Sequence, residues 1–176
     1  RLYRILPSRP AAGGDQTVVE PVNVPLGNAQ GLLWAHDSLY VVVNSGQKDF
    51  AQRNGLYRIQ DTNGDGHLDT GARLQAINGE GEHGPHAVIQ SADGKHLYVL
   101  CGNHTAPIDF DRSRVPPVWD EDQLLPRMWD AHGHAAGILA PGGWIARTDP
   151  DGQLWECVSI GYRNHYDIAV HSSDEL

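Results

Sequence analysis

Short apolar runs separated by polar turns recur along the whole chain. The run Leu2-Tyr3-Arg4-Ile5 returns as Leu56-Tyr57-Arg58-Ile59 and, more weakly, as Trp144-Ile145-Ala146-Arg147. Each copy is followed by a polar turn, a second apolar run, a glycine-rich segment and a third apolar run. The first two copies add a fourth run. Runs of this kind, bounded by Gly and Asp, are typical of β-strands. The pattern predicts strands at 2–5, 17–22, 32–35, 39–43, 56–59, 73–77, 87–89, 97–100, 144–147, 153–160 and 168–170.

A repeated unit of four short strands is typical of a β-propeller blade. The three copies begin at residues 2, 56 and 144, so the intervals between them are 54 and 88 residues. An ordinary blade has about 40–50 residues. We expect an all-β fold that supplies about three four-stranded blades of a six-bladed propeller. A β-sandwich is the alternative, although sandwiches do not repeat a strand-turn motif so closely.

The longer second interval indicates an insertion within one domain. The domain spans 1–176, and its non-repeating stretch covers about 103–141. Long insertions in compact folds are usually functional or disordered, and the tryptophans and prolines here favour an ordered flap. We interpret His132-Gly133-His134 within it as surface histidines rather than a metal site. The chain opens in strand-like sequence and stops where another strand begins, so we expect both ends to be truncated.

The acidic composition narrows the range of partners. The net charge is −9, with 13 basic residues against 22 acidic ones, which argues against a nucleic-acid partner because phosphates need a basic surface. No apolar run approaches the ~20 residues of a membrane-spanning helix. Cys101 and Cys157 both fall in strand-like runs, and two buried free thiols are favoured over a disulfide between neighbouring strands.

The glycine-rich segments carry most of the candidate chemistry. In a propeller such segments link successive blades and meet near the central channel. Convergent polar groups are the usual geometry of a ligand site, although any single one of them could simply cap a strand end. The polar residues in question are Asn28, Gln30, Glu82, His83, His86, Arg163, Asn164 and Tyr166.

Within this set, His83 is the best candidate for a catalytic base. An imidazole accepts protons near neutral pH, and the adjacent Glu82 carboxylate could raise its basicity or hold it in place. Arg163 is permanently charged, so it could stabilise a developing oxyanion or bind an anionic cofactor.

Two segments resemble the glucose/sorbosone dehydrogenase family of soluble quinoproteins, which are six-bladed propellers. They are Glu82-His83-Gly84-Pro85-His86-Ala87-Val88, with Gly102-Asn103 further on, and Gly161-Tyr162-Arg163-Asn164-His165-Tyr166. The resemblance implies that His83 removes a hydroxyl proton from a sugar or alcohol while hydride passes to pyrroloquinoline quinone. It also implies that Arg163 and Asn164 contact the quinone.

Among the converging polar residues, Gln30, His86 and Tyr166 are the expected substrate contacts, and the resemblance bears on Gln30 in particular. Two departures bear on them. His86 replaces a glycine common in the family, which narrows the pocket, and Gln30 lies one place from the expected glutamine.

Other segments are similar to a bacterial branch of large secreted proteins described as membrane-bound dehydrogenases. These segments are Gly31-Leu32-Leu33-Trp34-Ala35, the stretch 126–134, and Ala140-Pro141-Gly142-Gly143-Trp144-Ile145. Members of this branch often carry a c-type haem domain. The resemblance therefore implies a periplasmic or secreted location and a haem domain as a partner in the full-length protein.

One loop resembles a calcium-binding loop. Asp61, Asn63, Asp65 and Asp69 occupy positions 1, 3, 5 and 9, and Gly66 occupies position 6. Position 12 is Ala72 instead of the usual glutamate, and the flanks predict strands, so the segment is not an EF-hand. A Ca²⁺ site and a plain polar turn both remain open, since Asn-Gly and Asp-Gly pairs also favour tight turns.

Three functions are compatible with these observations. The first is a dehydrogenase that oxidises a sugar or related alcohol with His83 as base. The second is a non-catalytic propeller that binds carbohydrate or a protein partner. The third is a calcium-stabilised structural repeat whose glycine-rich segments are only linkers.

Overall fold

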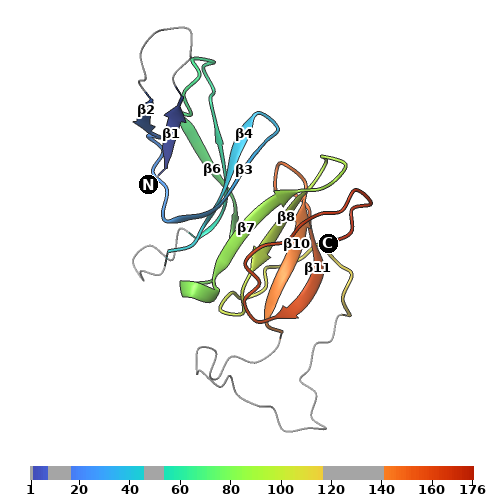
Figure 1. Cartoon of the computed structure of the whole chain (residues 1–176). Coiled ribbons are helices and arrows are strands. Elements are labelled where there is room, and N and C mark those ends of the chain that lie inside the picture. The colour runs from blue at the N-terminus through green and yellow to red at the C-terminus, as the bar shows by residue number, and fades with distance from the viewer. Residues whose placement is uncertain (1, 8–16, 46–53, 117–140) are drawn as a thin grey trace.

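The computed structural model describes residues 2–7, 17–45, 54–116 and 141–176 (Figure 1). These residues form an all-β structure of three open sheets with one short 3-10 helix, η2 (Gly81–His83). None of the described helices is long and apolar enough to cross a membrane. The strands are β1 (Tyr3–Leu6), β2 (Val18–Pro21), β3 (Ala29–Ala35), β4 (Ser38–Val43), β5 (Gly55–Gln60), β6 (Thr70–Ala76), β7 (Pro85–Gln90), β8 (Leu97–Cys101), β9 (Arg112–Ser113), β10 (Gly143–Thr148) and β11 (Trp155–Tyr162).

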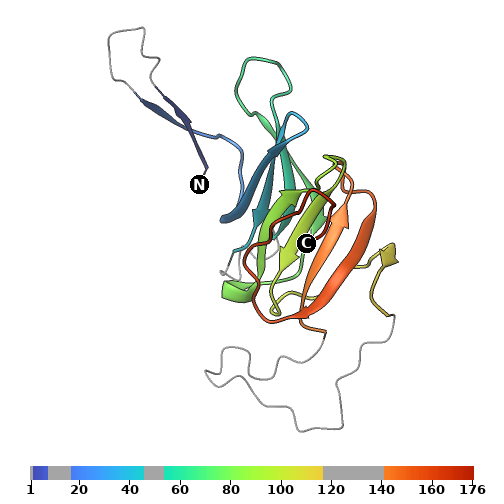
Figure 2. The same ribbon diagram turned by 45° about the vertical axis from the view of Figure 1, so that its right-hand side comes forward.

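Two of the sheets share the same antiparallel up-and-down topology. One has the order β3-β4-β5-β6 and the other β7-β8-β10-β11, with β9 added in parallel at the outer edge of β11. The third sheet is the hairpin β1-β2, which Figure 2 shows set apart from the two larger sheets. The all-β prediction is confirmed. A closed ring is not shown by the described residues, so the propeller remains a prediction.

The central strands are buried on both faces, which follows from their alternating side chains. Tyr40 and Val42 of β4 face the β7–β11 sheet, where they join a core that includes Val99 and Trp144. Val41 of β4 belongs to a second core on the opposite face. β4 is therefore apolar at almost every position, as a strand between two layers must be.

The second large sheet is likewise covered on both sides. Its face away from β3–β6 holds Tyr98, Leu100 and Ile145, against which Ile168 and Val170 pack. The predicted strand at 168–170 is wrong, because this segment has no strand assignment. Its apolar side chains pack on the neighbouring sheet, yet no described strand lies alongside to complete a hydrogen-bonded ladder.

The sequence repeat and the sheets are offset. The second repeat begins on β5, the third strand of its sheet, and continues through β7 and β8, the first two strands of the next sheet, and the third repeat likewise begins on β10, the third strand of its sheet. The two sheets meet closely where Gly31 of β3 lies beside β7. A Cβ atom at Gly31 would lie 2.7 Å from the Cα of Ala87 and 2.7 Å from the carbonyl oxygen of His86, so a larger residue would push the sheets apart.

The insertion is described only in part. Residues 103–116 run from the end of β8 to the outer edge of the sheet, where Arg112–Ser113 forms β9. Residues 117–140, which include His132 and His134, lie outside the described residues. Cys101 and Cys157 are both buried and free, as predicted. They sit on strands β8 and β11, which β10 separates.

Leu56→Ala should destabilise the protein strongly, because Leu56 is fully buried between the two large sheets. We expect the free energy of unfolding to fall by about 2–5 kcal/mol. Leu154→Ala makes the same chemical change at a residue that is 58% exposed, and its effect should stay within about 0.5 kcal/mol. Urea unfolding of both variants tests this, and equal losses would contradict the layered packing.

Candidate functional site

Three chain segments meet at one end of the β7–β11 sheet (Figure 1). They are η2 before β7, residues 102–105 after β8, and residues 163–166 after β11. Backbone hydrogen bonds connect them: His104 N donates to the His83 carbonyl at 3.0 Å, and Asn103 N donates to the Arg163 carbonyl at 2.8 Å. The segments before β7, after β8 and after β11 thus reach the same place.

His83 lies at the centre of this cluster and is only 2% exposed. Its Nδ1 is 2.6 Å from Asn103 Oδ1. An amide oxygen can only accept, so Nδ1 carries the proton and Nε2 of the neutral ring keeps a lone pair. Nε2 lies 3.8 Å from Glu82 Oε1, and the ring stacks on His104 with 4.5 Å between centroids.

His86 forms a second imidazole contact of the same kind. Its Nε2 lies 2.6 Å from Asn164 Oδ1, and its ring stacks on Tyr166 with 4.1 Å between centroids. Burial lowers the pKa of His86, although the hydrogen bond to Asn164 opposes that shift and the nearby His83 adds to it. The buried Nδ1 of His86 has no hydrogen-bond partner among the residues that the structure describes.

Close packing fixes these two histidines relative to each other. A Cβ atom at Gly102 would lie 2.5 Å from the His83 carbonyl oxygen and 2.9 Å from Asn164 Oδ1. Gly84 is equally confined, because its Cβ would lie 2.5 Å from Nδ2 of Asn44 at the end of β4. Glycine is required at both positions for the segments to approach one another.

His165 is a further histidine of the same segment, close enough to His86 for the two rings to interact electrostatically. Its ring lies against Tyr162 with 4.3 Å between centroids, and within the described part of the chain neither ring nitrogen has a hydrogen bond of normal geometry. Burial lowers its pKa to about 4, with a polar contact to the Trp144 backbone opposing the shift and His86 adding to it. The ring is therefore neutral at physiological pH.

The structure brings most of the sequence-predicted residues together. Glu82, His83, His86, Asn164 and Tyr166 belong to the contacts described above, and Arg163 lies exposed in the same segment as Asn164. Gln30 is an exposed residue of β3, and its side chain makes none of these contacts.

Sequence reasoning missed four residues of this end of the sheet. They are Asn44, Asn103, His104 and His165, all polar residues just beyond a strand end. For Asn103 a signal existed, since Gly102-Asn103 belongs to the segment that carries the family resemblance. The Asn44 contact, in which Nδ2 donates to the Gly81 carbonyl at 2.8 Å, gives no such signal in the sequence.

A surface depression adjoins the cluster. Its wall includes Asn103 and His104, which both contact the His83 ring. The lining residues are Glu80, Asn103, His104, Thr105, Ala106, Pro107, Pro141 and Gly142.

The residues at this end of the sheet are only partly suited to bind a quinone cofactor that carries carboxylates. Arg163 is exposed at this end, and its guanidinium suits a carboxylate of such a cofactor. The amide oxygen of Asn164 is already used by His86. Arg163, with the amide nitrogen of Asn164, would hold the quinone.

In the calcium-like loop between β5 and β6, the acidic and amide side chains accept hydrogen bonds from the backbone of the same loop. Asp61 accepts from Gly64 N and Gly66 N, both at 2.7 Å, and Asn63 Oδ1 accepts from Asp65 N at 2.9 Å. Asp65 and Asp69 likewise accept from His67 N at 2.8 Å and Thr62 N at 3.2 Å. No three His, Cys, Asp or Glu side chains among the described residues gather as metal ligands. The loop is explained as a polar turn, and Ca²⁺ binding stays a prediction.

Searches of family models, curated proteins and solved structures found nothing that matches this chain.

Calcium should raise the melting temperature if the loop binds it, because a ligand that binds only the native state adds stability by mass action. We expect a higher midpoint in millimolar Ca²⁺ than in chelator, and no difference for Asp65→Ala. If the two midpoints are the same for the parent, or if Asp65→Ala responds as the parent does, the loop is a plain turn.

Acid should destabilise the fold through His165. Its native pKa of about 4 lies below the unfolded value of about 6.5, so the unfolded state binds more protons in between. Stability should be full above about pH 6.5 and should fall by on the order of 2 kcal/mol by about pH 4.5.

His165→Phe keeps a ring but removes the titrating group, so its stability should depend less on pH than that of the parent. His171→Gln, at an exposed histidine, should behave like the parent. The measurement is urea unfolding at several pH values, and an unchanged slope in His165→Phe would refute the assignment.

Proposed function

We propose that this chain is part of a β-propeller dehydrogenase that oxidises a hydroxyl group of a sugar or related alcohol, with His83 as the base. The observation that carries the proposal is the environment of His83. Its Nδ1 is held by Asn103 and its Nε2 lies 3.8 Å from a Glu82 carboxylate oxygen, at a point where three links between strands converge.

The layered packing supports the propeller part of the proposal. In a two-sheet sandwich the outer face of each sheet meets solvent. Here β4 and β8 are buried on both faces. Leu2, which precedes the β1–β2 hairpin, packs on the outer face of the β3–β6 sheet. Ile168 and Val170 pack on the outer face of the β7–β11 sheet. Layers that continue in both directions are expected of successive blades.

The chemistry assigned to His83 is a proton transfer. The hydroxyl proton moves to the Nε2 lone pair while the hydrogen on the same carbon leaves as hydride, so the alcohol becomes a carbonyl compound. Glu82, 3.8 Å from Nε2, stabilises the imidazolium that forms. A quinone-type acceptor supplies the oxidising capacity when bound. Arg163 would hold such an acceptor through a carboxylate.

A calcium ion in the 61–69 loop, a c-type haem domain and a periplasmic or secreted location belong to the same proposal. The haem domain and the location are supported by the resemblance of the sequence to the secreted dehydrogenase branch, and the calcium ion by the spacing of Asp61, Asn63, Asp65 and Asp69.

One observation favours a second function, a propeller that binds carbohydrate or a protein without catalysis. His83 is only 2% exposed, and the adjoining depression is lined by Asn103 and His104 rather than by His83 itself. In this alternative the histidine holds the links in place, and a ligand contacts only the surrounding residues.

His83→Gln should reduce turnover by about 10²–10⁴-fold, because the amide cannot accept the hydroxyl proton. The measurement is dye-linked oxidation of a panel of aldoses and alcohols by the full-length protein with added quinone. His171→Gln makes the same change at an exposed histidine outside the cluster and the calcium-like loop, so its turnover should equal that of the parent.

The possible results separate the two functions. If the parent oxidises no member of the panel, the binding function is favoured. If His83→Gln is as fast as the parent, the base has been assigned wrongly, and His86 is the next residue to substitute.

A further inference from the structure

The candidate base His83 is held by more than its hydrogen bond. Asn103 Oδ1 accepts from Nδ1 at 2.6 Å and so fixes one edge of the imidazole. One hydrogen bond leaves the ring able to tilt, because the χ2 torsion of histidine has a broad energy minimum. A general base has to present its lone pair in a defined direction to the proton that it accepts. A second contact is therefore needed to fix the plane of the ring.

His104 makes a contact with the face of that ring. The two imidazoles stack with 4.5 Å between centroids and 30° between their planes, a geometry in which aromatic rings attract each other. Asn103 and His104 are consecutive residues. One short segment after β8 therefore holds both the edge and the face of His83.

The segment that carries His104 is itself anchored. His104 N donates to the His83 carbonyl at 3.0 Å. The next residue, Thr105, is only 3% exposed and forms an isolated β-bridge with Gly79. The bridge is closely packed, because a Cβ atom at Gly79 would lie 2.5 Å from Thr105 Oγ1. The backbone on both sides of the His104 side chain is thus fixed relative to His83.

The same pair of contacts recurs at His86. Asn164 Oδ1 lies 2.6 Å from His86 Nε2, and Tyr166 stacks on the ring with 4.1 Å between centroids and 28° between planes. Both contacts again come from one segment, which here follows β11 instead of β8. An asparagine at the edge and an aromatic ring at the face therefore hold each of these two imidazoles.

We propose that His104 is a positioning residue for His83. Its ring fixes the plane of the His83 imidazole, so that the Nε2 lone pair keeps one direction relative to a bound hydroxyl group. Side chains that are locked by a neighbour in this way lose less of their catalytic effect to misalignment. The effect on turnover rests on the proposed dehydrogenase function, whereas the order of the His83 ring is measurable without any reaction.

The first test measures how fast diethyl pyrocarbonate, a reagent that acylates neutral imidazoles, modifies His83 in the full-length protein, with peptide mass spectrometry as the readout. His104→Ala removes the stacked ring, so His83 should react about three- to tenfold faster than in the parent. His104→Phe keeps a flat ring at the same place, so its His83 should react as slowly as that of the parent. The exposed His171 should react equally fast in all three proteins.

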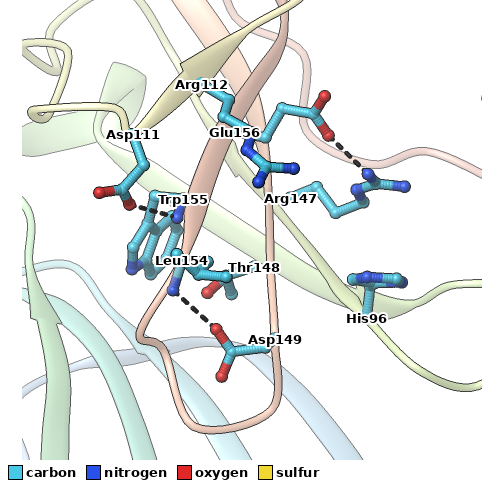
Figure 3. A pocket seen from close by; sticks show the side chains of 9 residues that line it. All are labelled: His96, Asp111, Arg112, Arg147, Thr148, Asp149, Leu154, Trp155 and Glu156. Atoms are coloured by element: carbon cyan, nitrogen blue, oxygen red, sulfur yellow. Dashed lines mark hydrogen bonds and ion pairs between the residues drawn. The ribbon is translucent and has the colours of Figure 1, made fainter.

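The second test measures turnover with an alcohol that the parent oxidises. His104→Ala should lower kcat by about 10- to 100-fold with a smaller change in KM, because a misdirected base slows the reaction step more than it weakens binding. His104→Phe should restore most of kcat. His96→Ala makes the matched change at a histidine that lines a pocket with Arg147 and Glu156 at the other end of β8 (Figure 3), and it should equal the parent in both tests.

The results separate this inference from the proposed function. If no alcohol is oxidised but His83 reacts faster in His104→Ala and not in His104→Phe, His104 positions His83 and the dehydrogenase proposal fails. The positioning role is overturned if His83 reacts equally fast in the parent and in His104→Ala, if His104→Phe behaves like His104→Ala, or if an active protein keeps its kcat in His104→Ala. His104→Asn, which also lacks an aromatic ring, takes the place of His104→Ala if that variant does not fold.

Discussion

The structure depends on the burial of sheets from both sides. In β4 and β8 the side chains that alternate along the strand enter two different cores, so each strand is held by the layers in front of and behind it. Removing water from two faces contributes roughly twice the hydrophobic stabilisation of a half-exposed sheet of the same length. It also fixes the register, because a slip by one residue would exchange the two faces.

This packing positions the candidate catalytic cluster. The sheets approach closely enough at Gly31 that β3 and β7 lie backbone to backbone, and the segments before β7, after β8 and after β11 are carried to one end. There His83 and His86 are each held by an asparagine from a different strand end. The rigid layers thus place two imidazoles whose partners come from distant parts of the chain.

The local part of this arrangement could be predicted from the sequence. The run at 39–43 became β4 because Val and Tyr fill a pleated, buried strand well, and the repeat placed His83 and Asn164 in equivalent links. The bond between His86 and Asn164 joins residues 78 positions apart, so no local pattern indicates it.

Two further misses have physical causes of their own. The strand predicted at 168–170 fails because pairing needs a neighbour as well as an apolar pattern. The strand at Arg112–Ser113 was missed because it is short and polar. It is held by its parallel pairing to β11 and by the Asp111–Trp155 hydrogen bonds rather than by hydrophobic burial.

The offset between the sequence repeat and the sheets has a consequence for folding. The β3–β6 sheet takes its first two strands from one repeat and its last two from the next, and the β7–β11 sheet does the same. No single repeat can complete a four-stranded sheet, so neighbouring repeats must fold together. Unfolding should therefore spread from one repeat to the next as one cooperative event, instead of proceeding module by module as in repeat arrays whose units are self-contained.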